Sequence, residues 1–177
     1  LQELLPVLLQ MLPKMMGEKS PLAIKSPQAK VETPQKPEKA IEGKSLDDAK
    51  KLFEEKKYSE ALAVVDSLLA NDPNCPELHA WKGHIMGTLA QGSPLDAMKY
   101  GMGAMQEYEK ALQLDPENAS AHFGRGMGRL MAPEGFGGDV AGAIEDFEFA
   151  CSKKTLPEAC YYLGVAYQKK GMKDKAK

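Results

Sequence analysis

Tyr162-Leu163-Gly164-Val165-Ala166-Tyr167, which leads to Gly171 and Ala176, is the stretch of sequence that decides the fold. It sets a glycine among large apolar and aromatic residues at the spacing of an amphipathic helix. A small residue inside one helix lets a second helix approach it closely. The stretch therefore predicts a helix that packs tightly against a partner, followed by a turn at Gly171.

Related phrases occur twice upstream. Tyr58-Ser59-Glu60-Ala61 leads, twelve residues later, to Pro73 in an Asn-Asp-Pro-Asn turn, and Ala104 leads by the same step to Pro116. Each proline ends a helix and sets the turn into the next unit. These units resemble the tetratricopeptide repeat, in which about 34 residues form a helix–turn–helix with a closing proline.

The resemblance implies an all-α solenoid of three to four helix–turn–helix repeats over residues 45–177. In such an array each repeat packs only on its neighbours. Small residues (Gly83, Gly126) and large ones (Val65, Tyr108, Phe147) are expected at the contacts between helices. The expected repeats span about residues 42–75, 76–118, 119–156 and, incompletely, 157–177.

Two insertions depart from the repeat pattern. Repeat two has about nine extra residues around Ser93-Pro94. We expect Ser93 to cap a helix and Pro94 to be the first residue of that helix, with lengthened helices on both sides of this turn. Repeat three has about five extra residues between Met131 and Val140, rich in Pro and Gly, and Asp139 is expected to cap the helix that follows. The insertion in repeat three resembles insertions in bacterial tetratricopeptide proteins, which favours a bacterial source.

The N-terminal quarter of the chain differs in composition. Residues 17–44 are rich in Pro, Lys and Glu and predict a flexible linker, because such a segment cannot bury enough apolar surface to offset its ordering entropy. Ser45-Leu46-Asp47-Asp48 then predicts a capping box at the start of the first helix. Residues 1–16 are apolar and amphipathic, with leucines at helical spacing: Leu4, Leu5, Leu8 and Leu12.

Composition excludes several classes of function. The formal net charge of −2 and the pI near 6.0 give no basic footprint for nucleic acid. No apolar run reaches the roughly 18 residues that a membrane span needs. Three cysteines are too few and too scattered for a disulfide framework, which favours a reducing, cytoplasmic setting. A periplasmic location would need a signal sequence before Leu1.

No motif for catalysis, a cofactor or a metal is found. Cys75, His79 and His84 are close in sequence, but the chain lacks the paired spacings of a zinc site, and repeat geometry accounts for them as positions near a helix start. The glycines of residues 133–139 lack the lysine of a P-loop. No nucleophile motif is present, so the chain is not expected to be an enzyme or to need a cofactor.

By resemblance, the fifth, ninth and twelfth positions of each first helix line a concave, peptide-binding groove. The Lys, Asn and Arg set of the family's carboxylate clamp is absent, so an acidic chaperone C-terminus is not the expected ligand. The groove offers an apolar, aromatic stripe instead, unless these side chains are simply buried between repeats. The positions are Leu46, Lys50 and Phe53; Ala80, His84 and Gly87; Phe123, Met127 and Leu130; and Tyr161, Val165 and Gln168.

The expected function is that of a protein–protein interaction adaptor or assembly scaffold that binds an apolar or helical segment in this groove. Residues 1–16 are one candidate occupant, in cis or in trans, and would make a homo-oligomer possible. A less favoured hypothesis places them on a membrane surface, since they carry a single lysine. Two further hypotheses for the whole chain are a periplasmic partner of a transport or envelope complex and a regulatory domain of a larger enzyme. Because Lys177 falls where a further helix is due, we expect the chain to continue or a neighbour to cover the last helix.

Overall fold

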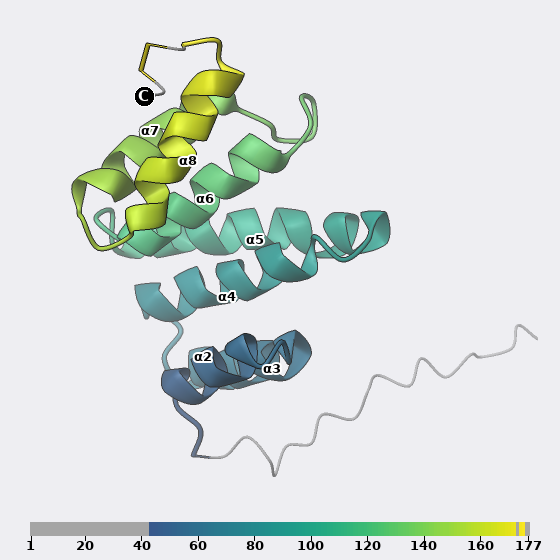
Figure 1. Ribbon diagram of the computed structural model, residues 1–177. Coiled ribbons are helices and arrows are strands. Elements are labelled where there is room, and N and C mark those ends of the chain that lie inside the picture. The colour runs from purple at the N-terminus through teal and green to yellow at the C-terminus, as the bar shows by residue number, and fades with distance from the viewer. Residues whose placement is uncertain (1–42, 173, 176–177) are drawn as a thin grey trace, which may run out of the picture. The chain divides into compact units, whose positions relative to one another are not determined.

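The structure is a computed structural model that describes residues 43–172 and 174–175. In this part of the chain every regular element is a helix, coloured from blue to yellow in Figure 1. The helices are α2 (Leu46–Glu54), α3 (Tyr58–Asn71), α4 (Pro76–Leu89), α5 (Pro94–Leu114), α6 (Ala119–Met131), α7 (Val140–Ser152) and α8 (Pro157–Lys169).

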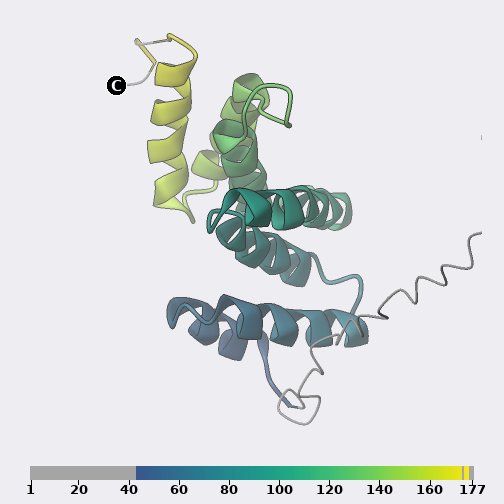
Figure 2. The same cartoon turned by 90° about the vertical axis from the view of Figure 1, so that its right-hand side faces the viewer.

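The helices pack as consecutive hairpins. Contacts are densest between α4 and α5, between α6 and α7 and between α7 and α8, and α2 likewise pairs with α3. Neighbouring pairs join through α3 with α4 and through α5 with α6, and Figures 1 and 2 show the pairs stacked in chain order. The predicted all-α solenoid of helical repeats is confirmed.

The sequence signals for helix starts are confirmed. Ser45 forms the capping box: its N–H donates to Asp48 Oδ2 at 2.8 Å, and its side chain accepts from the Asp48 N–H. Ser93 caps α5, with a proline as first helical residue, and Asp139 accepts from the Gly142 N–H at 2.9 Å to cap α7. Local sequence therefore fixes where these three helices begin.

The insertion in repeat two lengthens only one helix, so the expectation of two lengthened helices was wrong. α5 has 21 residues, whereas α4 has 14, the same length as α3. The turn closes early, where the Gly92 N–H donates to the Leu89 carbonyl at 3.1 Å. All the added length therefore follows the turn, and in Figure 1 the first turns of α5 extend past the neighbouring helices.

The core is a series of small apolar clusters between helices. Val65, Tyr108 and Phe147, the residues predicted to fill the space between units, are 0%, 4% and 0% exposed. Each belongs to a different cluster, and the predicted small contacts lie beside them: a Cβ on Gly83 would come within 2.8 Å of the Tyr108 ring, and one on Gly126 within 2.8 Å of Phe147.

Replacement of two helical glycines by alanine should change the stability of the protein in opposite directions. A Cβ on Gly124 would overlap the Cζ, Cε1 and hydroxyl atoms of Tyr108, whereas a Cβ on Gly101 would meet nothing within 4 Å. Gly124→Ala is expected to destabilise the protein by about 1–3 kcal/mol through overpacking. Gly101→Ala should stabilise it by up to about 1 kcal/mol through helix propensity. Urea unfolding of both variants checks this, and equal shifts would contradict the packing at Gly124.

One disulfide joins α7 to α8, although the cysteine pattern of the sequence did not indicate it. Cys151 in the last turn of α7 is bonded to Cys160 in α8, with Cα atoms 4.9 Å apart. The turn between the two helices brings the cysteines together although nine positions separate them in sequence. Cys75 is the free cysteine of the described residues.

Candidate protein-binding face

Each of the two middle hairpins is fastened by a histidine between its helices. His79 of α4 places Nδ1 at 2.6 Å from Glu107 of α5 and Nε2 at 2.9 Å from the Pro73 carbonyl oxygen. Lys82 adds ion pairs to Glu107 at 2.8 Å and to Asp66 of α3 at 3.2 Å. Burial alone would raise the pKa of Glu107, but the hydrogen bonds from Lys82 and His79 outweigh it and hold this pKa below its usual range.

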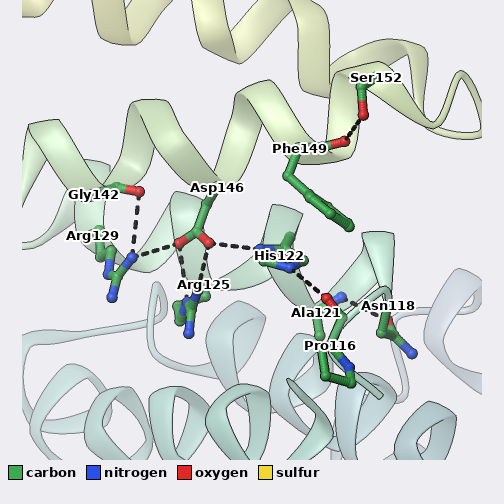
Figure 3. A network of polar contacts seen from close by, with 10 residues as sticks. All are labelled: Pro116, Asn118, Ala121, His122, Arg125, Arg129, Gly142, Asp146, Phe149 and Ser152. Atoms are coloured by element: carbon green, nitrogen blue, oxygen red, sulfur yellow. Dashed lines mark hydrogen bonds and ion pairs between the residues drawn. The ribbon is translucent and has the colours of Figure 1, made fainter. Parts of the chain in front are cut away.

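The next hairpin repeats the arrangement around a buried carboxylate (Figure 3). Asp146 of α7 is 2% exposed and faces three basic side chains of α6. His122 Nδ1 lies 2.8 Å from Asp146 Oδ1, Arg125 donates to both carboxylate oxygens at 2.7 and 3.0 Å, and Arg129 donates to Oδ2 at 2.8 Å. His122 Nε2 again lies near a proline carbonyl, that of Pro116, at 3.0 Å.

This cluster ties α6 to α7 through a buried carboxylate. Burial alone would raise the pKa of Asp146, but the hydrogen bonds from His122 and Arg125 and the charges of Arg125 and Arg129 lower it overall. The carboxylate is therefore ionised near neutral pH, with its lone pairs engaged. No group of three or more His, Cys, Asp or Glu that could hold a metal occurs in the described part of the chain.

The first helices of the hairpins are α2, α4, α6 and α8. They share a face that carries aromatic side chains. Between α2 and α4, the ring of Phe53 lies 6.0 Å from that of Trp81 and 5.0 Å from that of His84. Between α6 and α8, the Phe123 and Tyr162 rings lie 5.8 Å apart. We call the side chains in this row that are half-buried or exposed the first-helix face: Phe53, Trp81, His84, Phe123, Met127, Tyr161, Tyr162 and Val165.

The first-helix face is apolar in character. Burial lowers the pKa of His84, against an opposing effect of Glu158, so its imidazole is neutral near pH 7. Lys50 lies over the Trp81 ring at 5.4 Å and is paired with Glu77 at 3.3 Å. The basic side chain over the Trp81 ring is thus already paired with an acid.

The predicted groove residues divide into three groups. Ala80 and Leu130, each 3% exposed, lie in the core and offer no free surface. His84, Phe123, Met127 and Val165 are half-buried, as are Leu46, Lys50, Phe53 and Gly87. Tyr161, at 69%, and Gln168 are exposed on α8. Sequence reasoning missed Trp81 and Tyr162, which contact other rings of the same row from positions that the family pattern does not assign to the groove.

The proposed occupant lies outside the described residues: Leu4, Leu5, Leu8 and Leu12 precede Gly43. None of the described helices is long and apolar enough to cross a membrane.

A second exposed apolar surface follows the lengthened start of α5. Leu95, Met98 and Met102 recur at helical spacing and are 74%, 77% and 75% exposed. Further along the same helix, Met105 packs toward α6, where a Cβ on Gly128 would meet its sulfur. The exposed stripe of Leu95, Met98 and Met102 therefore lies on the part of α5 that α6 does not cover. No other described residue covers this stripe.

The glycine-rich insertion forms the expected loop between α6 and α7. Gly135 and Gly137 have φ values of 87° and 92°, and Phe136 is 85% exposed. A surface hollow of about 480 Å³ beside the loop is bordered by Glu134 and Lys169, but the Lys169 ammonium already donates to the Leu130 carbonyl at 2.7 Å. The hollow presents no cluster of unpaired polar groups.

Comparison with known proteins agrees with this architecture. A family model described as TPR repeat matches residues 103–127, from the middle of α5 into α6. Together with the stacked helical hairpins, the match shows that the fold is an array of tetratricopeptide-like helical repeats. No curated protein sequence matches it.

Solved structures share the fold. A structure titled crystal structure of MamA protein is 23% identical with a TM-score of 0.53, over 74% of this chain and 64% of that one. A second, titled crystal structure of MamA, is 26% identical with a TM-score of 0.53, over 72% of this chain and 67% of that one. The chain thus spans about two thirds of each MamA chain.

Proposed function

We propose that the protein is an interaction scaffold whose first-helix face binds an apolar or helical segment of another polypeptide. The observation that carries this proposal is the row of aromatic side chains along α2, α4, α6 and α8, of which Tyr161 is 69% exposed. Rigid aromatic rings bury a large apolar area at a small cost in side-chain entropy. The neutral His84 and the paired Lys50 favour an apolar ligand over an acidic one.

Residues 1–16 are the occupant that the chain itself offers. Their leucines recur at the i, i+3, i+4, i+7 spacing with which helices bind in apolar grooves. If residues 17–44 behave as a flexible chain, their r.m.s. span is roughly 30 Å. Tethering of this kind gives effective concentrations of about millimolar, in cis or toward a neighbouring copy.

A peptide titration tests the proposal. The receptor is the full chain carrying Leu4→Glu and Leu8→Glu, which removes competition from its own arm. A synthetic peptide of residues 1–16 is added, and the fluorescence of Trp81, which lies in the face, is followed. We expect saturable binding with a Kd on the order of 1–100 µM.

A matched pair of substitutions gives the control. Tyr161→Glu, on the first-helix face, should weaken binding about tenfold or more, whereas Phe136→Glu, in the exposed loop, should not change it. Both positions are largely exposed, so neither change disturbs the core. Absence of binding at about 100 µM peptide, or equal effects of the two substitutions, would remove the arm as ligand of this face.

The disulfide favours a second candidate, a partner of an envelope or transport complex in an oxidising compartment such as the periplasm. Disulfides persist in oxidising compartments and are rare in the cytosol. The pair Cys151–Cys160 is therefore a specific observation in favour of this setting over the cytoplasmic one. Non-reducing mass spectrometry of protein trapped with an alkylating agent in intact cells separates the two, since cytoplasmic protein would carry both thiols alkylated.

A further inference from the structure

In three of the first helices, the residue at the fourth position links the helix to the chain that precedes it. His79, His122 and Cys160 each occupy the fourth position of their helix, in α4, α6 and α8. The histidines make equivalent contacts, so their positions correspond in structure as well as in number. Cys160 therefore stands where the two preceding hairpins have a histidine.

The two histidines fasten each first helix to the chain that precedes it. In both cases Nε2 donates to a proline carbonyl six residues earlier, at 2.9 Å for Pro73 and 3.0 Å for Pro116. These prolines lie in the turns that leave α3 and α5. The contact, which we call the histidine clip, ties the start of a first helix to the end of the previous hairpin.

In α8 a covalent bond connects the corresponding places. Cys160 is bonded to Cys151, which lies in the last turn of α7. The disulfide thus joins the start of a first helix to the last turn of the preceding second helix, whereas the histidine clip reaches the turn that follows that helix. Unlike a hydrogen bond, this link depends on the redox state of its surroundings.

We propose that the Cys151–Cys160 disulfide is a redox-controlled clip that holds α8, and with it the last part of the first-helix face, on the repeat array. On closing, the two thiols lose two electrons and two protons and form one S–S bond. A disulfide-bearing oxidant, either a small molecule or a protein dithiol–disulfide partner, takes them up and becomes two thiols. Reduction by a dithiol reverses the step.

The packing of α8 shows why the clip matters most there. α4 and α6 are each packed between neighbours on both sides, whereas the contacts of α8 within the described residues are chiefly with α7, with fewer to α6. Ala159, Ala166 and Tyr167 are buried, but Tyr161 and Gln168 are exposed. A helix with fewer packing partners opens more easily than one packed on both sides.

Removal of the crosslink should therefore increase the fraction of molecules in which α8 is open, without the same effect on the other helices. A disulfide that closes a short loop favours the closed form by on the order of tenfold to a hundredfold. Only the consequence for peptide binding rests on the proposed function: α8 carries Tyr161 and Val165, so an open α8 would present an incomplete face.

Hydrogen exchange on the full chain tests the clip. Cys75→Ser serves as the background, so that no third thiol can exchange partners. Alkylation followed by mass spectrometry first establishes the redox state of the pair. We expect amide exchange across residues 157–169 to rise about tenfold or more on reduction with dithiothreitol, with no change across residues 76–89.

A crosslink-free variant keeps the test independent of the reductant. Cys151→Ala with Cys160→Ala, in the same background, should exchange like the reduced protein without any reductant. The clip is refuted if the pair is alkylated at both thiols after incubation with oxidised glutathione, or if exchange in α8 is the same in the oxidised, reduced and double-alanine proteins. A response of α8 in a protein that binds no peptide would support the clip and count only against the proposed function.

Discussion

Asp146→Ala is expected to lower the free energy of unfolding by about 3 kcal/mol or more, the largest effect of any single polar substitution in the described chain. The Asp146 carboxylate is 2% exposed and accepts hydrogen bonds from Arg125 and Arg129 and pairs with His122. Its removal leaves two guanidinium groups and an imidazole, all partly buried, facing one another without a counter-charge. Breaking a buried pair on one side costs more than the pair itself contributes.

Urea unfolding monitored by circular dichroism measures this loss. Glu145→Ala is the matched control, because Glu145 is the adjacent acid on α7 and is exposed, and its replacement should change stability by less than about 0.5 kcal/mol. A loss below about 1 kcal/mol for Asp146→Ala would contradict the role assigned to the carboxylate.

The pH dependence of the free energy of unfolding gives a second test of Asp146→Ala. Because the folded protein lowers the pKa of Asp146 from its ordinary value of 3.8, the ionised carboxylate contributes stability that is present above this value. That contribution is lost as the pH falls through the lower, folded pKa. The difference in stability between the parent protein and Asp146→Ala should therefore be constant near neutral pH and narrow below about pH 4.

Phe147→Ala should cost a further large amount, about 3–5 kcal/mol, through the lost apolar burial and the cavity left behind. The Phe147 ring is fully buried, its centroid lies 5.9 Å from that of Phe123 and 6.1 Å from that of Tyr162, and Gly126 of α6 is packed against it. The side chain therefore joins α6, α7 and α8, and its loss weakens all three contacts.

Phe136→Ala is the control of identical chemistry, because Phe136 is 85% exposed in the loop after α6. Its replacement should leave stability within about 0.5 kcal/mol of the parent protein. Thermal or urea unfolding of the two variants compares a buried and an exposed phenylalanine in one chain. Similar losses for both would contradict the placement of Phe147 at the junction of the three helices.

The parts of the fold that could be predicted are those that depend on residues close together in sequence. Gly83 and Gly126 indicated close helix contacts, and Tyr108 sits against the first of them as expected. Ser93 and Asp139 indicated helix starts, because a side-chain oxygen at that position satisfies a backbone N–H within three residues. These signals need no knowledge of which helix packs on which.

The features that sequence reasoning missed depend on contacts between distant residues. His79 stands close to Cys75 and His84 in sequence, yet its ring faces Glu107 on the next helix, 28 positions away. Nothing in the sequence near His79 indicates that pairing. The disulfide was missed for a related reason, since the turn after α7, rather than the spacing of Cys151 and Cys160, brings the two thiols together.

The candidate face was predictable only as a set of positions. Family geometry placed Ala80 and Leu130 toward the groove, but both are covered by neighbouring helices. The same geometry did not include Trp81, whose ring lies against those of Phe53 and His84. Whether an inward position is exposed depends on the spacing between hairpins, and that spacing depends on the particular side chains at each junction.

Site-specific photo-crosslinking asks whether the ligand sits on the first-helix face or elsewhere on the array. Benzoylphenylalanine is placed at Tyr161, on this face, or at Met98, on the uncovered stripe of α5, in the full chain with Leu4→Glu and Leu8→Glu. The two positions are comparably exposed, at 69% and 77%. With the peptide of residues 1–16 added, we expect a crosslinked product from position 161 and none from position 98. A product from position 98 alone would show that the α5 stripe is the binding surface and that the first-helix face is not.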